Sequence, residues 1–262
     1  MFDIKLFRKA FKAKDETISA ATNFFFAGCD EVGRGPLAGP VVAACASLHF
    51  ETYDEKDIKK LFKEWGIFGI TDSKKLTAEK RQQIISDLPF GDNLTINQIY
   101  THSYSKNMTL KILIKEISPQ EIDQINILNA SLKAMRQAAE ESCTFKKRGL
   151  ILIDGNRKFP LESSPDFFNV ELMTVIEGDA KSLLIGLASI VAKEYRDTLM
   201  KKYCEQYPGY HWSSNAGYAT KKHLAAIAEL GITDIHRKSF AGVKDFSYET
   251  EAAEYAMEGT GE

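Results

Sequence analysis

Apolar residues along this chain follow two patterns, one of short continuous runs and one of helical spacing. The short runs, rich in β-branched and aromatic residues, predict strands at 23–30, 41–50, 94–104, 149–154 and 169–176. Apolar residues spaced by three or four positions predict helices at 78–88, 118–141 and 180 to about 203. Three strands followed by alternating helices and strands indicate an α/β protein whose sheet has antiparallel and parallel parts.

The two ends of the chain differ from its middle in charge. Residues 1–14 carry five basic groups and one acid around several apolar residues, and 1–22 is expected to form a basic arm that packs on the surface. Residues 245–262 contain six acids and no base and are expected to form an acidic tail. Without those six acids the formal charge of −2 becomes +4. A mildly basic body permits a nucleic-acid partner without requiring one.

Cysteine spacing and hydropathy bear on where the protein works. The four cysteines lack the paired spacing of a zinc site or a redox pair, and they are interpreted as reduced core thiols: Cys29, Cys45, Cys143 and Cys204. No stretch reaches the roughly 18 apolar residues of a membrane span, and the N-terminus lacks the apolar region of a secretory signal. We therefore expect a cytoplasmic protein with no membrane partner. We also expect it to act as a monomer.

Acidic residues at the ends of apolar runs are the main chemical feature. Asp30 and Glu31 follow the first predicted strand. Asp154 ends the fourth, and Asp179 stands at the start of the long apolar helix. Clustered carboxylates repel one another unless raised pKa values or bound cations relieve the repulsion. Oxygen ligands suit Mg²⁺ or Mn²⁺, and two such ions about 4 Å apart can activate water and stabilise the leaving oxygen of a phosphodiester. The alternative is ordinary loop acids, with Asp179 as a helix N-cap.

Asp197 is a further acid in the same region, 18 residues beyond Asp179 on the predicted helix. At about 1.5 Å per residue the two would lie about 27 Å apart, too far to share a metal centre. Lys193, four residues earlier, offers a side-chain partner. We therefore expect a structural role for Asp197.

A glycine-rich segment follows the first acids. Residues 33–38 (GRGPLA) match the dinucleotide-binding pattern G-x-G-x-x-A. The next segment is predicted to be a strand, so no helix N-terminus is available there to hold a pyrophosphate. The sequence therefore argues against a dinucleotide site. A Gly-Arg-Gly loop can instead let backbone amides approach a sugar or phosphate closely.

Several blocks of sequence stand in a fixed order along the chain: CDEVGRGPLAGPV at 29–41, TDSKKL at 71–76, DGN at 154–156, GDAKS at 178–182, ASIVAK at 188–193, RD at 196–197, YPGY at 207–210, GYAT at 217–220 and HRKSF at 236–240. Taken together in this order, they resemble the ribonuclease HII family of type 2 ribonucleases H. The resemblance runs from about residue 24 to 242. It leaves the basic arm and the acidic tail unexplained.

The resemblance implies a ribonuclease H-like α/β fold with a five-stranded mixed sheet flanked by helices at 23–205 and a small C-terminal helical part at 206–244. It implies that two Mg²⁺ or Mn²⁺ ions are bound by the catalytic acids Asp30, Glu31, Asp154 and Asp179. The family reaction is hydrolysis on the 5′ side of a ribonucleotide, in RNA–DNA hybrids or in duplex DNA with single ribonucleotides, leaving 3′-hydroxyl and 5′-phosphate ends. Such an enzyme would serve ribonucleotide repair and primer removal.

The resemblance also implies substrate contacts. The loop residues Gly33, Arg34 and Gly35 would read the ribose 2′-hydroxyl largely through the backbone. Tyr218 would pack on the sugar beyond the ribonucleotide. The sequence departs from the family at two positions: Ala216 stands where the family usually has a basic residue, and Ala219 where it usually has a glycine. These departures put in doubt how strongly the protein binds the nucleic-acid strand and how strongly it prefers an RNA–DNA junction. Val32 in place of the commoner alanine is a small change.

Other side chains are candidates for phosphate contacts or for structural roles. The phosphate candidates are Arg34, Lys74, Lys75, Lys181 and Ser182. Lys181 and Ser182 follow Asp179 in the first helical turn, where amides and the helix dipole favour an anion. A solvated loop is an equally good explanation for the two lysines at 74 and 75. His223 and His236 have no ligand partner at a useful spacing and are expected to be structural.

Two other functions remain open. A catalytically silent hybrid-binding protein is one, although a repulsive acid cluster gives a binder no advantage beside phosphates. A ribonuclease HIII-like enzyme that prefers longer RNA tracts is the other. That enzyme usually has a sizeable extra N-terminal domain, and about 23 residues precede the resemblance here.

Overall fold

The computed structural model describes residues 2–12, 22–52, 54–91, 94–143, 148–161 and 169–246. Most of the predicted acidic tail, and residues 13–21 of the predicted arm, lie outside them. The chain divides into two compact units. Unit 1 comprises Met1–Val32, Val42–Glu116 and Ser131–Tyr195, and unit 2 comprises Gly33–Val41, Ile117–Ala130 and Arg196–Glu262. The domain boundary proposed at 205/206 stays a prediction.

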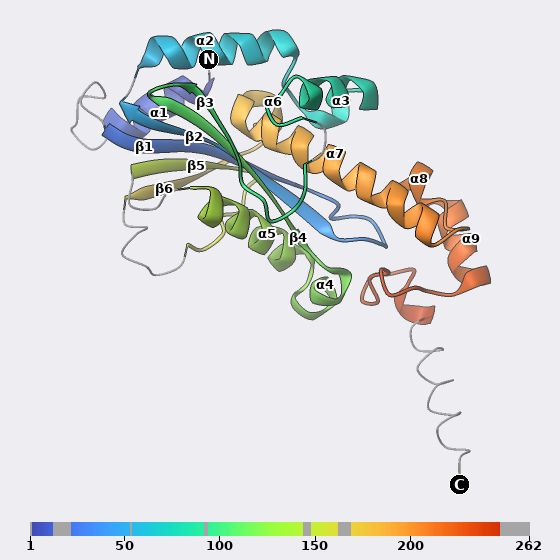
Figure 1. Ribbon diagram of the computed structural model, residues 1–262. Coiled ribbons are helices and arrows are strands. Elements are labelled where there is room, and N and C mark those ends of the chain that lie inside the picture. Colours follow the sequence, from blue (N-terminus) through green and yellow to red (C-terminus); the bar gives the residue numbers. More distant parts are fainter. Residues whose placement is uncertain are drawn as a thin grey trace. The chain divides into compact units, whose positions relative to one another are not determined.

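A six-stranded mixed sheet forms the centre of unit 1 (Figure 1). Its strands are β1 (Thr22–Val32), β2 (Val41–Thr52), β3 (Tyr100–Ser105), β4 (Met108–Ile117), β5 (Arg148–Asp154) and β6 (Val170–Val175), in the order β3-β4-β2-β1-β5-β6. β1 pairs antiparallel with β2 and parallel with β5, and β5 pairs parallel with β6. The α/β class with a mixed sheet is confirmed, but the predicted count of five strands is wrong by one.

The additional strand comes from a hairpin where one strand was predicted. β3 has the polar sequence YTHSYS and pairs antiparallel with β4, with a register irregularity between Ser103 and Ser105. β4 contains the buried residues Leu110, Ile112 and Ile114. These residues alternate with Lys111 and Lys115, which is a strand pattern that the prediction did not use. The polar strand β3 gains order from its pairing with β4.

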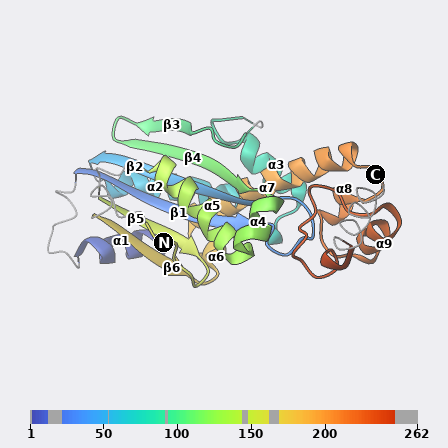
Figure 2. The same ribbon diagram turned by 90° about the horizontal axis from the view of Figure 1, so that it is seen from below.

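Helices cover both faces of the sheet in unit 1 (Figures 1 and 2). One face packs against α2 (Glu55–Phe68), α3 (Ala78–Ser86) and the first half of α7 (Leu183–Gln206). The other face packs against α5 (Ile127–Ser142), which supplies small buried residues such as Ala134 and Ala138. The N-terminal helix α1 (Phe2–Lys12) adds Ile4 to the core of the α7 face.

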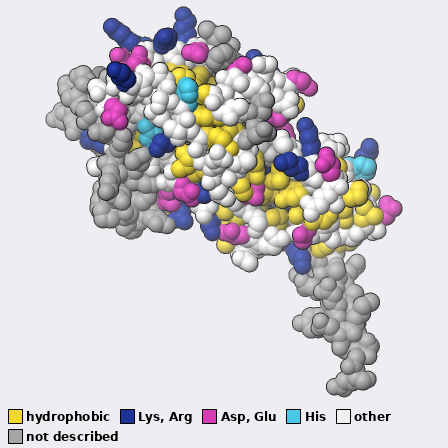
Figure 3. Space-filling view, viewed as in Figure 1, with side chains coloured by type: hydrophobic (Ala, Val, Ile, Leu, Met, Phe, Trp, Pro, Cys, Tyr) yellow, Lys and Arg dark blue, Asp and Glu magenta, His cyan; other side chains and the backbone are white. Residues whose placement is uncertain are grey.

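α2 shows why this sequence forms a surface helix. Ile58, Leu61, Phe62 and Trp65 share a buried side, whereas its lysines are exposed. Basic side chains project from the outer side of α2 in the space-filling view (Figure 3). Asp54 caps the first turn by accepting from the amide of Lys56 at 2.8 Å, and the left-handed Gly69 ends the helix.

Local capping residues refine the predicted helices. Thr77 caps α3 by accepting a hydrogen bond from the amide of Lys80 at 3.2 Å, so this helix begins where the sequence predicts it. The helix predicted at 118–141 is interrupted at Asn126, whose φ of 65° separates α4 (Pro119–Ile125) from α5. The long apolar helix begins with a separate turn, α6 (Gly178–Lys181), and continues as α7 after Ser182. A short 3₁₀ helix, η2 (Ser73–Lys75), precedes α3.

Unit 2 has a smaller aromatic core. It contains α4, α8 (Trp212–Asn215), α9 (Lys221–Leu230) and the end of α7. Trp212 is fully buried and stacks on Tyr210 with ring centroids 4.8 Å apart. Leu37 and Ala38 from the glycine-rich segment belong to the same core. Across the described ranges, no helix combines the length and the apolar character needed to cross a membrane.

Candidate active site

Parallel pairing of β1 and β5 brings two of the predicted acids together. Cys29 and Ile153 are partners in the register, so the next residues, Asp30 and Asp154, stand side by side where these strands end. Asp30 is 6% exposed, because its side chain faces the first half of α7 rather than solvent. Its Oδ1 accepts a hydrogen bond from the amide of Glu31 at 2.8 Å.

The turn after β6 adds Asp179. The amide of Gly178 donates to Asp154 Oδ1 at 2.7 Å, which links the end of β5 to the start of α6. Asp179 Oδ1 accepts from the amide of Ala180 at 2.9 Å. Glu177, rather than Asp179, takes the N-cap position of α6, so Asp179 is not the helix cap considered as an alternative.

Mutual repulsion in this group appears in the pKa values of the carboxyls. Burial, followed by the charges of Glu31 and Asp154, raises the pKa of Asp30 well above its ordinary value. Burial, followed by the charges of Asp154 and Asp72, raises the pKa of Asp179. These shifts mean that ionising the group costs free energy, which a nearby cation would offset.

Asp72 is an acid of this group that was not predicted from the sequence. Its side chain forms a hydrogen bond with Asp179. It also caps η2 by accepting from the amide of Lys74 at 2.9 Å. The signal for Asp72 in the sequence is the TDSKKL block at 71–76, of which only Lys74 and Lys75 were predicted to contact substrate. We refer to Asp30, Glu31, Asp72, Asp154 and Asp179 as the acid cluster.

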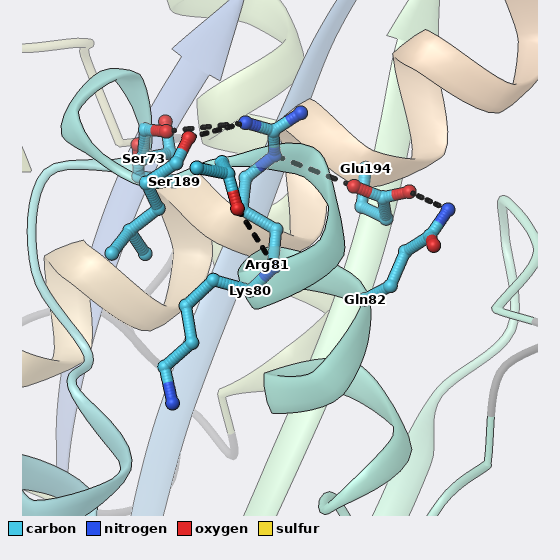
Figure 4. Close-up of polar contacts among 8 residues, drawn as sticks. Ser73, Lys80, Arg81, Gln82, Ser189 and Glu194 are labelled. Atoms are coloured by element: carbon cyan, nitrogen blue, oxygen red, sulfur yellow. Dashed lines mark hydrogen bonds and ion pairs between the residues drawn. The ribbon is translucent and has the colours of Figure 1, made fainter.

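A buried polar network supports η2 behind the acid cluster (Figure 4). Arg81, 6% exposed, donates to the carbonyl oxygens of Ser73 and Leu76 at 3.4 and 2.9 Å. Its Nε also lies 3.3 Å from Glu194 on α7. Ser73 Oγ and Ser189 Oγ are 2.8 Å apart, and Ser189 hydrogen-bonds Asp30. Asp30 and the segment carrying Asp72 are therefore joined through two serines and one arginine.

The donor set of the acid cluster suits a hard divalent cation, since every candidate ligand is a carboxylate oxygen. The raised pKa of Asp30 and of Asp179 fits a place where positive charge is favoured. In the part of the chain that the structure describes, no three Asp, Glu, His or Cys side chains stand together as a ready set of metal ligands. A metal at this cluster is therefore a proposal, and it rests on the carboxylate ligands and on the raised pKa values of Asp30 and Asp179.

The predicted substrate loop lies in unit 2 and is held by a buried arginine. Arg237, 0% exposed, donates to the carbonyl oxygens of Gly33, Arg34 and Gly39, the last two at 3.0 and 2.9 Å. All described peptide bonds are trans. Because C=O and N–H point in opposite directions across a trans peptide, the amides of Arg34 and Gly35 are directed away from Arg237. They form a pair of adjacent donors on the other side of the loop.

A second buried arginine, Arg196, holds the rest of the loop. Its guanidinium donates to the carbonyl oxygens of Pro40, Ala38 and Ala216 at 3.1, 3.1 and 3.0 Å. Burial lowers the pKa of Arg196 to about 10 and, together with the charge of Arg196, lowers that of Arg237 to about 9. Both side chains therefore remain positive at neutral pH beneath the loop. Neither arginine was predicted from the sequence to belong to the site.

Tyr218 lies beside this loop in unit 2. It is 45% exposed, and a methyl group at Gly35 would come within 3.4 Å of its ring. The imidazole of His223 lies 2.9 Å from the Tyr218 carbonyl oxygen through Nδ1. The structure therefore brings Gly33, Arg34, Gly35 and Tyr218 together, and both predicted structural histidines are buried beside them.

Lys74, Lys181 and Ser182, three further residues predicted to contact phosphate, differ in their exposure and in their hydrogen bonds. Lys74 is exposed on η2. Lys181 is exposed, but its Nζ donates to the carbonyl of Ile176 at 2.6 Å and lies 3.6 Å from Glu177. Ser182 is 1% exposed, and its Oγ caps α7 by accepting from the amide of Ile185 at 3.2 Å. A phosphate contact by Ser182 would require this cap to open.

Comparison with known proteins assigns the family. The family model for ribonuclease HII matches residues 27–243. A ribonuclease HII of Ruegeria pomeroyi is 37% identical over 235 residues, covering 90% of this chain and 84% of that protein. A ribonuclease HII of Rickettsia bellii is 40% identical over 218 residues, covering 83% and 90%.

Solved structures show the same fold. The ribonuclease H2 of Pyrococcus horikoshii aligns with a TM-score of 0.59 at 22% identity, over 87% of this chain and 99% of that one. Bst ribonuclease HIII, solved in complex with Mn²⁺, aligns with a TM-score of 0.54 at 15% identity, over 90% and 73%. The family match and the two relatives agree with the order of blocks in the sequence. This chain belongs to the ribonuclease HII family and is a type 2 ribonuclease H endonuclease.

Proposed function

We propose that this chain hydrolyses the RNA strand of RNA–DNA hybrids and cuts on the 5′ side of single ribonucleotides in duplex DNA. The products would carry 3′-hydroxyl and 5′-phosphate ends. The observation that carries the proposal is the acid cluster, in which burial and neighbouring charge raise the pKa of Asp30 and of Asp179. A buried group of this kind is poor for stability and suited to binding cations next to a phosphodiester.

Asp30, Glu31, Asp154 and Asp179 would hold two Mg²⁺ or Mn²⁺ ions. Bst ribonuclease HIII, which shares the fold, was solved with Mn²⁺. Such ions, when bound, activate a water and stabilise the leaving oxygen. The protein side chains contribute the negative charge and the placement: the amide of Gly178 orients Asp154, and Ser189 contacts Asp30. Asp72 forms a hydrogen bond with Asp179 and would orient it.

Selection for a ribonucleotide would come from the loop in unit 2. The amides of Arg34 and Gly35 are directed away from Arg237 and can donate to a ribose 2′-oxygen, which DNA lacks. The half-exposed ring of Tyr218 offers an apolar surface for a sugar. Exposed Arg34 and Lys74 remain candidates for phosphate contacts, and Lys181 and Ser182 are weaker ones because of their existing hydrogen bonds.

One assay separates this proposal from its rivals. Duplex DNA with a single ribonucleotide, and a hybrid with a long RNA tract, are each incubated with the protein and either Mg²⁺, Mn²⁺ or EDTA. Cleavage 5′ to the single ribonucleotide, only with a metal, is the expected result. Binding without cleavage would indicate the silent hybrid-binding protein. Cleavage of the long tract alone would indicate a ribonuclease HIII-like preference.

Several finer expectations accompany the proposed activity. Roles in ribonucleotide repair and primer removal follow from the substrate and would be tested in cells that lack the protein. The cytoplasmic location and the monomeric state stay predictions from the sequence. Mg²⁺ and Mn²⁺ are distinguished by comparing cleavage rates at equal concentrations of each.

A further inference from the structure

The N-terminal helix α1 lies outside residues 27–243, which match the family model. One of its side chains nevertheless reaches the N-terminus of α7. Asp3 is 1% exposed, and its Oδ2 accepts a hydrogen bond from the amide of Leu183 at 2.8 Å. The same carboxylate hydrogen-bonds the side chain of Ser182.

Apolar and charged contacts hold α1 in this position. Ile4 is 4% exposed within the core of unit 1, and Phe2 and Leu6 pack against the same core. Further along α1, the Arg8 guanidinium donates to both carboxylate oxygens of Glu55 on α2. Because these contacts fix α1 against the rest of unit 1, they hold the Asp3 side chain at the start of α7.

Asp3 meets a specific need of α7. A helix leaves its first amides without partners, and a negative charge there is favourable. Ser182 Oγ accepts from the amide of Ile185, and Asp3 accepts from that of Leu183. The cap of this 24-residue helix is therefore shared between a local serine and a carboxylate 180 residues away in the sequence.

The first turn of α7 is packed tightly against α6, the turn that carries Asp179. A methyl group at Gly186 would lie 2.9 Å from the carbonyl oxygen of Asp179. A methyl group at Gly178, whose amide binds Asp154, would lie 2.6 Å from Cδ1 of Ile185. A small shift of this turn would therefore move the backbone that carries Asp179.

We propose that Asp3 is a positioning residue for the acid cluster: by capping α7 from α1, it holds the first turn of α7 and thereby Asp179 in place for binding metal. The inference rests on the proposed function, since it takes Asp179 as a metal ligand. Asp3 is a poor choice for stability alone. Its Oδ1 is buried without a hydrogen-bond partner among the described residues, and burial raises its pKa to about 6.

Metal binding and amide exchange in the full-length protein test this role. Mn²⁺ titrations are followed by electron paramagnetic resonance, and hydrogen exchange of the Leu183 amide is measured without metal. In Asp3→Ala, exchange at Leu183 is expected to accelerate and Mn²⁺ affinity to fall about tenfold, as when an outer partner of a metal ligand is lost. Asp3→Asn keeps an acceptor for Leu183 and is expected to restore Mn²⁺ affinity to within about threefold of wild type.

Arg8→Ala is the matched control, because it removes a contact of α1 at the end away from Leu183. It is expected to retain wild-type Mn²⁺ affinity. Faster exchange at Leu183 in Asp3→Ala with unchanged Mn²⁺ affinity would overturn the proposal, as would an Asp3→Asn as weak as Asp3→Ala. Should Asp3→Ala not fold, Asp3→Gln takes its place, since its amide group extends beyond the position of the carboxylate.

Asp179→Asn separates failure of this inference from failure of the proposed function. If Asp179→Asn leaves Mn²⁺ binding unchanged, Asp179 is not a ligand and the proposed function itself fails. If Asp179→Asn abolishes binding while Asp3→Ala does not affect it, only the positioning role of Asp3 is overturned.

Discussion

The amide of Gly178 donates to Oδ1 of Asp154 at 2.7 Å, and a methyl group at Gly178 would lie 3.0 Å from that same oxygen. This close approach fixes one carboxylate oxygen of the acid cluster to the turn that begins α6. Any side chain at Gly178 must displace either the carboxylate or Cδ1 of Ile185, which would be 2.6 Å away. The observed position of the Asp154 carboxylate therefore requires glycine at position 178.

Gly178→Ala is expected to lower kcat about tenfold with a modest loss of stability, because the flexible end of Ile185 can move while Asp154 is displaced. Steady-state kinetics and thermal unfolding measure the two effects. Gly28→Ala is the comparison, since its methyl group would lie 2.4 Å from the backbone nitrogen of Ile185. It is expected to destabilise the fold strongly, by about 3 kcal/mol or more. Equal losses of stability in both variants would contradict this account.

Asp30→Asn is expected to lower turnover by about a thousandfold or more, since it removes a proposed metal ligand. The folded-state pKa of Asp30 is raised, so its ionisation at neutral pH disfavours folding. Asn keeps an acceptor for the amide of Glu31 and removes that charge. The variant should therefore melt at the same or a higher temperature than wild type in EDTA. An inactive variant that melts well below wild type would indicate a structural role instead.

Asp3→Asn is expected to change how stability depends on pH. Burial raises the pKa of Asp3 from 3.8 to about 6. The protonated Asp3 side chain therefore stabilises the folded protein below pH 3.8, and this stabilisation is lost as the pH rises through 6. Asp3→Asn does not lose stability in this way, because its side chain does not titrate. Its stability relative to wild type should rise between pH 4 and 7 by up to about 3 kcal/mol. Denaturant unfolding at several pH values measures the difference, and a difference independent of pH would contradict it.

Arg237→Lys is expected to be destabilising by about 3 kcal/mol or more, although it conserves charge. Lysine cannot place three donors on the carbonyls of Gly33, Arg34 and Gly39, and buried carbonyls without partners are costly. Because the loop loses its support, discrimination between ribonucleotide and deoxyribonucleotide should weaken. Competition cleavage assays measure it. Lys238→Arg, at the next position, is the control and should retain discrimination.

His236→Asn is expected to flatten the acid side of the stability profile. His236 Nδ1 accepts from the amide of Thr233 at 2.9 Å, and burial and His223 lower its pKa to about 4. The unfolded chain binds the proton more tightly, so wild type loses stability as pH falls from 6.5 to 4. Asn keeps a hydrogen-bond acceptor for the amide of Thr233 but does not titrate. The variant should therefore lack most of the stability loss of wild type between pH 6.5 and 4, which is up to about 3 kcal/mol. Parallel profiles for the two proteins would contradict this assignment.

The parts of the site that the sequence predicts are those with local causes. Asp30 and Asp154 end adjacent parallel strands, so their proximity follows from the apolar runs before them. Thr77 marks the start of α3 through its own capping hydrogen bond. The order of motif blocks then assigns the family, which the comparisons confirm.

The parts that the sequence does not predict depend on long-range packing. Asp72 approaches Asp179 because Arg81 and Ser189 hold η2 against α7, and Ser73 and Ser189 are 116 residues apart. Arg196 and Arg237 bind backbone carbonyls in a buried setting, whereas most arginines lie at the surface. β3 is polar along its whole length, and its order comes from pairing with β4.

β3 occupies one outer edge of the sheet, and its register irregularity lies between Ser103 and Ser105. A bulged, polar edge is a poor template for a strand from another molecule. Strands of neighbouring copies therefore gain little by adding to this side of the sheet. Aggregation of the protein through this edge of the sheet is therefore disfavoured.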